Sequence, residues 1–311
     1  MATRKSMKKI LLIMLMLIGL ASFLALSSLA APKWPIPEGL KTIEVNGYDM
    51  AYQETGSGIP LVLVHGTVTD YRYWGLQMEP LASSYRVIAP SLRHFYPERW
   101  NGEGSDFSVE QHAKDLAVFI KGLHAGPVHL VGHSRGGDVA LLLAKAEPGL
   151  LLSLTLADPA PLEGLLPKMP EAAAEAGARR AFVTAALERL QQSDVDGGLE
   201  KFVDGTSGPG AWKTLPEPLR QALRENVWSI KSLLTDAQAS FTCADAAAIK
   251  APVLLITGER SPRPYGVMLE SLASCLKRHK KVTIPNASHA MNRANPQAFN
   301  AAVLAFLANP Q

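Results

Sequence analysis

Short apolar segments typical of β-strands alternate with helix-like segments along most of the chain. Strands are predicted at residues 60–66, 86–90, 127–132, 251–258 and 280–286, and in the run LLSLTLADP. Between them, VEQHAKDLAVFIKGL and GGDVALLLAKAEP repeat apolar residues at helical spacing. This alternation predicts the α/β class, a mostly parallel sheet with helices on both faces. Ligands of such sheets bind beyond the carboxyl ends of the strands, so we expect the functional residues there.

The remaining elements predict the domain organisation. TIEVNG and DMAYQETG predict an opening hairpin, and NPQAFNAAVLAFLANP predicts a closing helix with Asn295 as N-cap and Pro296 at its first position. Between residues 161 and 240 the strand pattern gives way to short amphipathic helices, among them 175–192 and 216–234. We therefore predict an α/β core at 31–160 and 241–311, with a helical lid inserted at 161–240.

The first 30 residues differ in composition from the rest of the chain. MATRKSMKK is basic, and a run of 17 residues without charge follows it, ILLIMLMLIGLASFLAL. Ser28 and Ala30 then have the spacing that a signal peptidase reads. Residues 1–30 are predicted to be a signal peptide cut after Ala30, so that the protein is periplasmic or secreted. The alternative is an uncleaved segment that anchors the protein in the membrane.

Net charge gives no indication of a nucleic-acid partner. The whole chain carries +3, but four basic residues belong to the predicted leader: Arg4, Lys5, Lys8 and Lys9. Without them the net charge falls to −1. A basic binding surface is therefore not predicted for the exported part.

The two cysteines, Cys243 and Cys275, lie 32 residues apart. An exported protein permits a disulfide between them, and two buried free thiols are the alternative. Neither cysteine has neighbours at metal-ligand spacing, so we predict no metal and no cofactor.

A nucleophile is predicted at Ser134. The residues Gly132-His133-Ser134-Arg135-Gly136 fit the pattern G-x-S-x-G between a predicted strand and a predicted helix. Such a turn is tight and presents the serine oxygen at the helix N-terminus. Serine is a weak nucleophile on its own and needs a neighbouring base. Of the eight histidines, His289 follows the last predicted strand and precedes the last helix, which places it at the same edge.

When a serine attacks a carbonyl group, the carbonyl oxygen becomes an oxyanion, and two fixed N–H donors are needed to stabilise it. One is predicted to be the N–H of Arg135, the residue after the nucleophile. The other is predicted from the loop after residues 60–66, with Thr67 as first choice and Val68 as second. Two interpretations of the Arg135 side chain stay open: contact with an anionic substrate group or the lid, or exposure to solvent.

These motifs resemble those of the α/β-hydrolase superfamily, in its lidded group of esterase-like and lactonase-like serine hydrolases. The resemblance covers roughly residues 40–308 and is carried by VLVHG, LVGHSRGG, PVLLITGERSP and NASHAMNRANP. It implies a triad acid three residues after Gly258, but that position is Ser261. Some family members place the acid on the strand after the nucleophile, which implies Asp158. Glu259 is the alternative acid.

The predicted function is hydrolysis of a small-molecule carboxylic ester or lactone through an acyl-serine intermediate. Two alternatives stay open: acyl transfer or perhydrolysis by the same triad, and a non-catalytic binding protein of the same fold. Aromatic residues are candidates for the pocket wall, or for ordinary packing, in two places: His94, Phe95, Tyr96 and Trp100 in the loop after residue 90, and Phe202, Trp212 and Trp228 in the lid.

Overall fold

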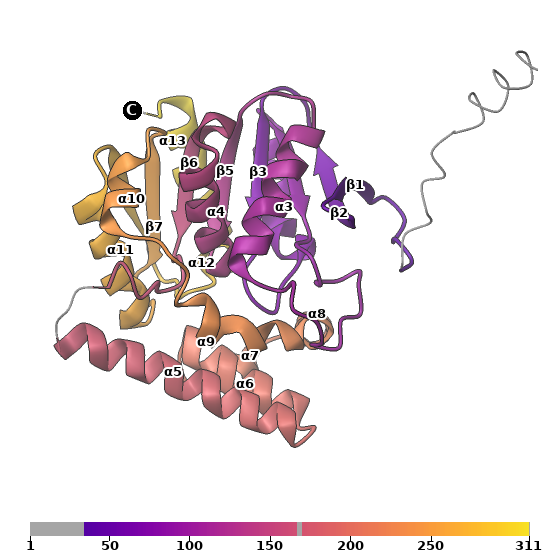
Figure 1. The fold of residues 1–311 in the computed structure, drawn as a ribbon, viewed down its shortest axis with the longest axis vertical. Helices are drawn as coiled ribbons and strands as arrows, with labels where there is room; N and C mark the ends of the chain where they lie inside the picture. The colour runs from indigo at the N-terminus through magenta and orange to yellow at the C-terminus, as the bar shows by residue number, and fades with distance from the viewer. Residues whose placement is uncertain (1–33, 167–169, 311) are drawn as a thin grey trace, which may run out of the picture. The chain divides into compact units, whose positions relative to one another are not determined.

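The computed structural model describes residues 34–166 and 170–310, and the predicted signal peptide lies outside them. Eight strands form one sheet in the order β1-β2-β4-β3-β5-β6-β7-β8 (Figure 1). Their bounds are β1 (Lys41–Val45), β2 (Tyr48–Thr55), β3 (Pro60–Val64), β4 (Arg86–Pro90), β5 (Val128–His133), β6 (Leu151–Ala157), β7 (Val253–Gly258) and β8 (His279–Ile284). β2 pairs antiparallel with β1 and β4, and all other neighbours are parallel. The mostly parallel sheet and its opening hairpin are thus confirmed.

Helices cover both faces of the sheet (Figure 1). Outside residues 170–236 they are η1 (Tyr71–Trp74), α2 (Gly75–Ala82), α3 (Val109–Gly122), α4 (Arg135–Ala146), η2 (Pro148–Leu150), α10 (Cys243–Ala248), α11 (Arg263–Cys275), α12 (Met291–Ala294) and α13 (Pro296–Ala308). Residues of α3, α4 and α11 share one apolar core, and those of α2 and α13 share the other. Successive residues of β3 alternate between the two: Val62 and Val64 belong to the first core, Leu61 and Leu63 to the second. Burial on both faces explains why this strand is a continuous apolar run.

The closing helix begins as its sequence indicates. The side chain of Asn295 accepts a hydrogen bond from the N–H of Ala298, and Pro296 occupies the first turn. Proline fits there because the first N–H groups of a helix have no partner within it.

The helical segment, residues 170–236 between β6 and β7, contains α5 (Pro170–Gln191), α6 (Val195–Ser207), α7 (Ala211–Thr214), α8 (Glu217–Glu225), η3 (Val227–Ser232) and α9 (Leu233–Asp236). It has its own apolar core and lies across the end of the sheet at which β6 ends (Figure 1). The single helix predicted at 216–234 is wrong, because the chain leaves helical geometry at Asn226. There the Asn226 amide donates to Asp70 Oδ2 at 2.7 Å and accepts from the N–H of Tyr96 at 2.8 Å. These tertiary bonds outweigh local helix propensity.

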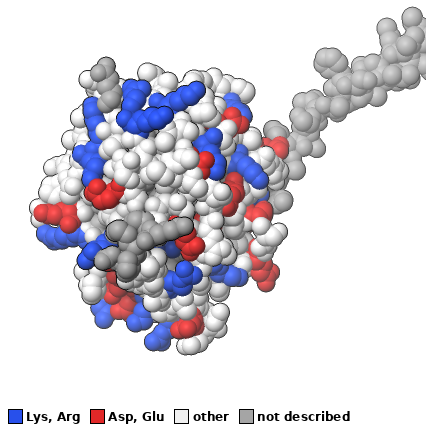
Figure 2. All heavy atoms as spheres, turned by 60° about the vertical axis from the view of Figure 1, so that its left-hand side comes forward, with Lys and Arg blue, Asp and Glu red and all other residues white. Residues whose placement is uncertain are grey.

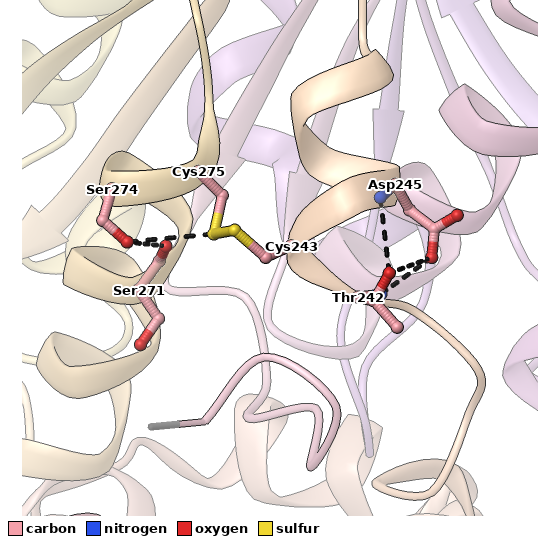
Figure 3. The surroundings of a disulfide bond; sticks show 6 residues. All are labelled: Thr242, Cys243, Asp245, Ser271, Ser274 and Cys275. Atoms are coloured by element: carbon pink, nitrogen blue, oxygen red, sulfur yellow. Dashed lines mark hydrogen bonds between the residues drawn. A yellow bond between two sulfur atoms is a disulfide. The ribbon is translucent and has the colours of Figure 1, made fainter. Parts of the chain in front are cut away.

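Cys243 and Cys275 form a disulfide, which settles the alternative left open by the sequence (Figure 3). The bond joins the start of α10 to the end of α11, with the two Cα atoms 5.2 Å apart. Thr242 and Asp245 cap the same end of α10 by bonding each other's backbone N–H groups (Figure 3). The disulfide therefore fixes two helices that cover the same half of the sheet.

Charged side chains of both signs are spread over the face shown in Figure 2. No helix among the described residues is long and apolar enough to cross a bilayer.

Candidate active site

Ser134 lies in the turn between β5 and α4 with φ 53° and ψ −125°. Residues other than glycine rarely adopt positive φ, so the surrounding structure must hold this turn. The N–H of Ser134 donates to the carbonyl of Ala157 at 3.0 Å, and its own carbonyl accepts from Gly137 at 2.8 Å. These bonds fix the serine at the carboxyl end of the central strands.

Both glycines of the motif are required by close backbone approach. A Cβ on Gly132 would lie 2.4 Å from the carbonyl oxygen of Gly136. A Cβ on Gly136 would lie 2.4 Å from the carbonyl oxygen of Val64. Any larger residue would push α4 away from the sheet, so the glycines are what allow the serine to be presented on so tight a turn.

His289 and Asp158 meet at the same edge. The Nδ1 atom of His289 lies 3.3 Å from Oδ2 of Asp158, although 131 residues separate them in the chain. His289 is 6% exposed and Asp158 is fully buried. A carboxylate at Nδ1 favours the tautomer with hydrogen on that nitrogen, which leaves Nε2 free to accept a proton.

Neighbouring rings fix the orientation of His289. The Tyr265 ring stacks on it with centroids 4.0 Å apart and an interplanar angle of 21°. Nε2 of His133 lies 2.8 Å from the backbone carbonyl of His289, which makes His133 a donor at that nitrogen. Burial lowers the pKa of His133 well below its usual value, so this neighbour is neutral near pH 7.

Ser261, at the position where the resemblance implies an acid, donates a hydrogen bond to Oδ2 of Asp158 at 2.5 Å. Its oxygen in turn accepts from the N–H of Gly258 at 3.1 Å. Sequence reasoning treated Ser261 only as a missing carboxylate and missed this role. Ser261 therefore helps to hold the carboxylate that faces His289.

The alternative acid, Glu259, points elsewhere. It is exposed, and its Oε2 accepts from the N–H of Asn286 at 2.7 Å. This bond stabilises the turn after β8 and uses the carboxylate away from His289. The geometry favours Asp158 as the acid.

The loop after β3 approaches Ser134 closely, since a Cβ on Gly66 would lie 2.9 Å from that of Ser134. Among the described residues, the backbone N–H groups of Thr67 and Arg135 have no hydrogen-bond partner. The N–H of Val68, the second choice for the oxyanion donor, is occupied by Ser229 Oγ at 2.9 Å. Of the three candidates named from the sequence, Thr67 and Arg135 therefore have N–H groups without a partner among the described residues, and Val68 does not.

The side chain of Arg135 is fully buried, which excludes the solvent-exposed interpretation. It forms an ion pair with Asp236 and donates to Ser232 Oγ at 2.8 Å, both in the helical segment. Its guanidinium also lies 4.6 Å from the centre of the Phe107 ring. Arg135 thus joins the serine turn to the helical segment.

A cavity of about 460 Å³ opens at Ser134 and His289. The helical segment supplies its apolar wall: Phe202, Val203, Leu215, Pro216, Leu219 and Leu223. The Ser134 hydroxyl makes no hydrogen bond to another described residue and is open to this cavity. Catalytic hydrogen bonds are often long without substrate and shorten when it binds.

Of the two interpretations of the aromatic residues in the loop after residue 90, ordinary packing is the one that fits, because that loop does not line the cavity. Its rings pack on one another instead: Trp100 stacks on Phe107 with centroids 4.4 Å apart. His94 binds Glu98 and Asp106, and Phe95 packs against His65. Of the three aromatics singled out in the helical segment, Phe202 lines the cavity and Trp212 belongs to the segment's own core.

Comparisons with known proteins agree with this architecture. A hydrolase of (E)-2-((N-methylformamido)methylene)succinate from Acinetobacter baylyi is 27% identical, covering 86% of this chain and 97% of that protein. A thermophilic esterase from Thermogutta terrifontis superposes with a TM-score of 0.68 at 25% identity, covering 86% of this chain and 97% of the esterase. A bacterial membrane phospholipase A superposes with a TM-score of 0.67 at 26% identity, covering 87% of this chain and 86% of the phospholipase. Residues 61–302 match the alpha/beta hydrolase family, and the chain belongs to that family.

Proposed function

We propose that this protein is an exported serine hydrolase that cleaves a carboxylic ester or lactone. The observation that carries the proposal is the arrangement of three groups at one cavity. Ser134 is held in a strained turn with its hydroxyl open to the cavity, His289 borders the same cavity, and Asp158 bonds the far nitrogen of that imidazole. This is the arrangement of a nucleophile, a base and an orienting acid.

In the proposed reaction, Ser134 Oγ attacks the carbonyl carbon while Nε2 of His289 takes its proton. The oxyanion formed is stabilised by the N–H groups of Thr67 and Arg135, each of which is worth about 10²- to 10³-fold in rate. Collapse breaks the bond to the leaving oxygen, which takes the proton from His289 and leaves an acyl-serine. Water then attacks the acyl group and gives a proton to His289, which passes it to Ser134 Oγ as the bond between Oγ and the acyl carbon breaks and the carboxylic acid is released. Asp158 stabilises the imidazolium without taking the proton.

We further propose that the helical segment acts as a lid that selects the acyl or alcohol group. What supports this is its contribution of the apolar wall opposite Ser134. Epoxide opening or dehalogenation through a carboxylate nucleophile is disfavoured, because residue 134 is serine.

A fluorophosphonate probe tests the proposal. We expect covalent labelling of the wild type, loss of labelling in Ser134→Ala, and retention in Ser207→Ala, which removes another serine hydroxyl lining the same cavity. Hydrolysis of para-nitrophenyl esters should follow the labelling. Labelling that persists in Ser134→Ala would refute the assignment of the nucleophile.

Export is the second part of the proposal. The Cys243–Cys275 disulfide supports it, since disulfides persist mainly in oxidising compartments. Mass spectrometry of the protein recovered from its cell fraction is expected to find an N-terminus at Ala31. An intact leader on a membrane-bound protein would favour the anchored alternative.

A further inference from the structure

The described side chains that line the cavity at Ser134 include a positive charge and no negative charge. Among the described residues that line it there is no aspartate or glutamate, and the single charged side chain is that of Arg293. The other lining groups are apolar side chains, hydroxyls and the two imidazoles of His133 and His289. The cavity therefore offers a lone cation within a largely apolar wall.

Arg293 lies on α12, four residues after His289, and is half-buried. Its guanidinium forms no hydrogen bond or ion pair with any residue in the described part of the chain. Burial raises the pKa of the nearby Tyr73 phenol, and the charge of Arg293 acts in the opposite direction. Tyr73 lines the cavity as well, so the positive charge is felt inside it.

A second polar group in the cavity also lacks a partner. Thr67 is 5% exposed, lines the cavity, and its hydroxyl makes no hydrogen bond to the residues described. A polar group shielded from water is destabilising unless a ligand or water satisfies it. The Arg293 cation thus shares the cavity with the proposed nucleophile, and Thr67, which lines the same cavity, has a buried hydroxyl that is also unsatisfied.

A substrate that fills this cavity displaces water from around Arg293. Burying an unpaired cation is costly, whereas a carboxylate paired with guanidinium forms charge-assisted, often bidentate hydrogen bonds. A neutral substrate would leave the buried Arg293 cation unpaired, which is unfavourable, whereas an anionic substrate would pair with it. The site should therefore discriminate between them.

We propose that Arg293 recognises a carboxylate on the substrate, so that the compound hydrolysed is an anionic ester or lactone. This inference rests on the proposed function and specifies its substrate class. The carboxylate belongs either to the acyl part or to the alcohol part, and the two sources are separated by experiment.

The test uses two pairs of esters, and the members of each pair differ in one carboxylate. The first pair, para-nitrophenyl hydrogen glutarate and para-nitrophenyl valerate, differs in a carboxylate on the acyl side. The second, para-acetoxybenzoate and its methyl ester, differs on the leaving-group side. In one of the two pairs we expect the wild type to prefer the anionic member about 10- to 100-fold in kcat/KM, the effect of one charged hydrogen bond.

Arg293→Met should abolish that preference by lowering kcat/KM for the anionic ester, whereas kcat/KM for the neutral ester should not fall, because no unpaired cation is then buried with it. Arg293→Lys should restore part of it, because the charge remains but the bidentate geometry is lost. Arg278→Met is the matched control, since it removes an exposed arginine just before β8, at the opposite edge of the sheet. Its preference should equal that of the wild type.

The inference fails if the wild type shows no preference in either pair, or if Arg293→Met changes both members of a pair equally. Failure of the proposed function looks different, because then no ester is cleaved and Ser134 is not labelled. In that case, calorimetric binding of hexanoate and hexanamide to the Ser134→Ala protein decides the inference alone. Tighter binding of hexanoate that is lost in Ser134→Ala/Arg293→Met upholds it, and equal binding of the two ligands overturns it.

Discussion

Replacing Asp158 by asparagine tests the proposed acid with little change of shape. In the structure, Oδ2 of Asp158 faces Nδ1 of His289 at 3.3 Å and receives the Ser261 hydroxyl at 2.5 Å. An asparagine can present an N–H donor to Nδ1 in place of the carboxylate. The imidazole then favours the tautomer with hydrogen on Nε2, which cannot accept the proton of Ser134.

Loss of a triad carboxylate reduces kcat by about 10⁴-fold, which corresponds to roughly 5.5 kcal/mol in the activation barrier. We expect a reduction of this order in Asp158→Asn, measured as kcat on para-nitrophenyl acetate. Ser261→Ala removes the hydrogen bond to the carboxylate together with the one accepted from the N–H of Gly258, and we expect about a tenfold loss. Circular dichroism and a melting curve check that each variant is folded.

Glu259→Gln is the matched control, since it removes the other carboxylate near this edge. Glu259 is exposed and bonds Asn286 rather than His289, so kcat should stay within about twofold of the wild type. The reasoning is refuted if Glu259→Gln loses activity and a folded Asp158→Asn protein retains it.

Three further predictions concern stability and substrate size. Burial lowers the pKa of His65 to about 4, whereas in the unfolded chain it is near 6.5, so the unfolded state binds more protons between these values. The free energy of unfolding should therefore fall as pH is lowered through this window, by about 2 kcal/mol at pH 5 from His65 alone, and urea titrations at pH 7 and pH 5 that coincide would contradict this. Replacing both Cys243 and Cys275 by alanine opens a loop with a sequence separation of 32 and should lower stability by roughly 3–4 kcal/mol, seen as a reduced urea midpoint. Reducing the disulfide of the wild type should lower the urea midpoint by a similar amount. An unchanged midpoint in both experiments would argue against a disulfide between Cys243 and Cys275. Leu219→Trp narrows the cavity wall and should shift the preferred acyl chain to shorter esters, by about fourfold in kcat/KM for each methylene excluded; an unchanged chain-length profile would argue that Leu219 does not contact the acyl group.

Local sequence patterns were sufficient for the fold and for the serine turn. The apolar runs at β3, β5 and β7 predict buried parallel strands because such strands need apolar residues on both faces. The glycines at 132 and 136 indicate the tight turn because any Cβ there would meet backbone oxygen. The order of Ser134 and His289 relative to the strands predicts one shared edge, and the structure places both at one cavity. Their catalytic roles stay predictions.

Contacts between distant segments could not be predicted in the same way. Asp158 and Glu259 both follow strands at the correct edge, and the direction of each side chain decides between them. The Arg135–Asp236 ion pair, the Cys243–Cys275 bond and the break at Asn226 likewise depend on how the helical segment and the outer helices pack.

The sequence by itself determined the class of fold, the strained serine turn and the edge at which the chemistry is expected, because these follow from residue spacing within single elements. Only the tertiary structure decided which carboxylate faces His289, what Arg135 binds and which charge is left unpaired in the cavity. Those outcomes are set by side-chain directions across elements up to 131 residues apart, and no local pattern encodes them.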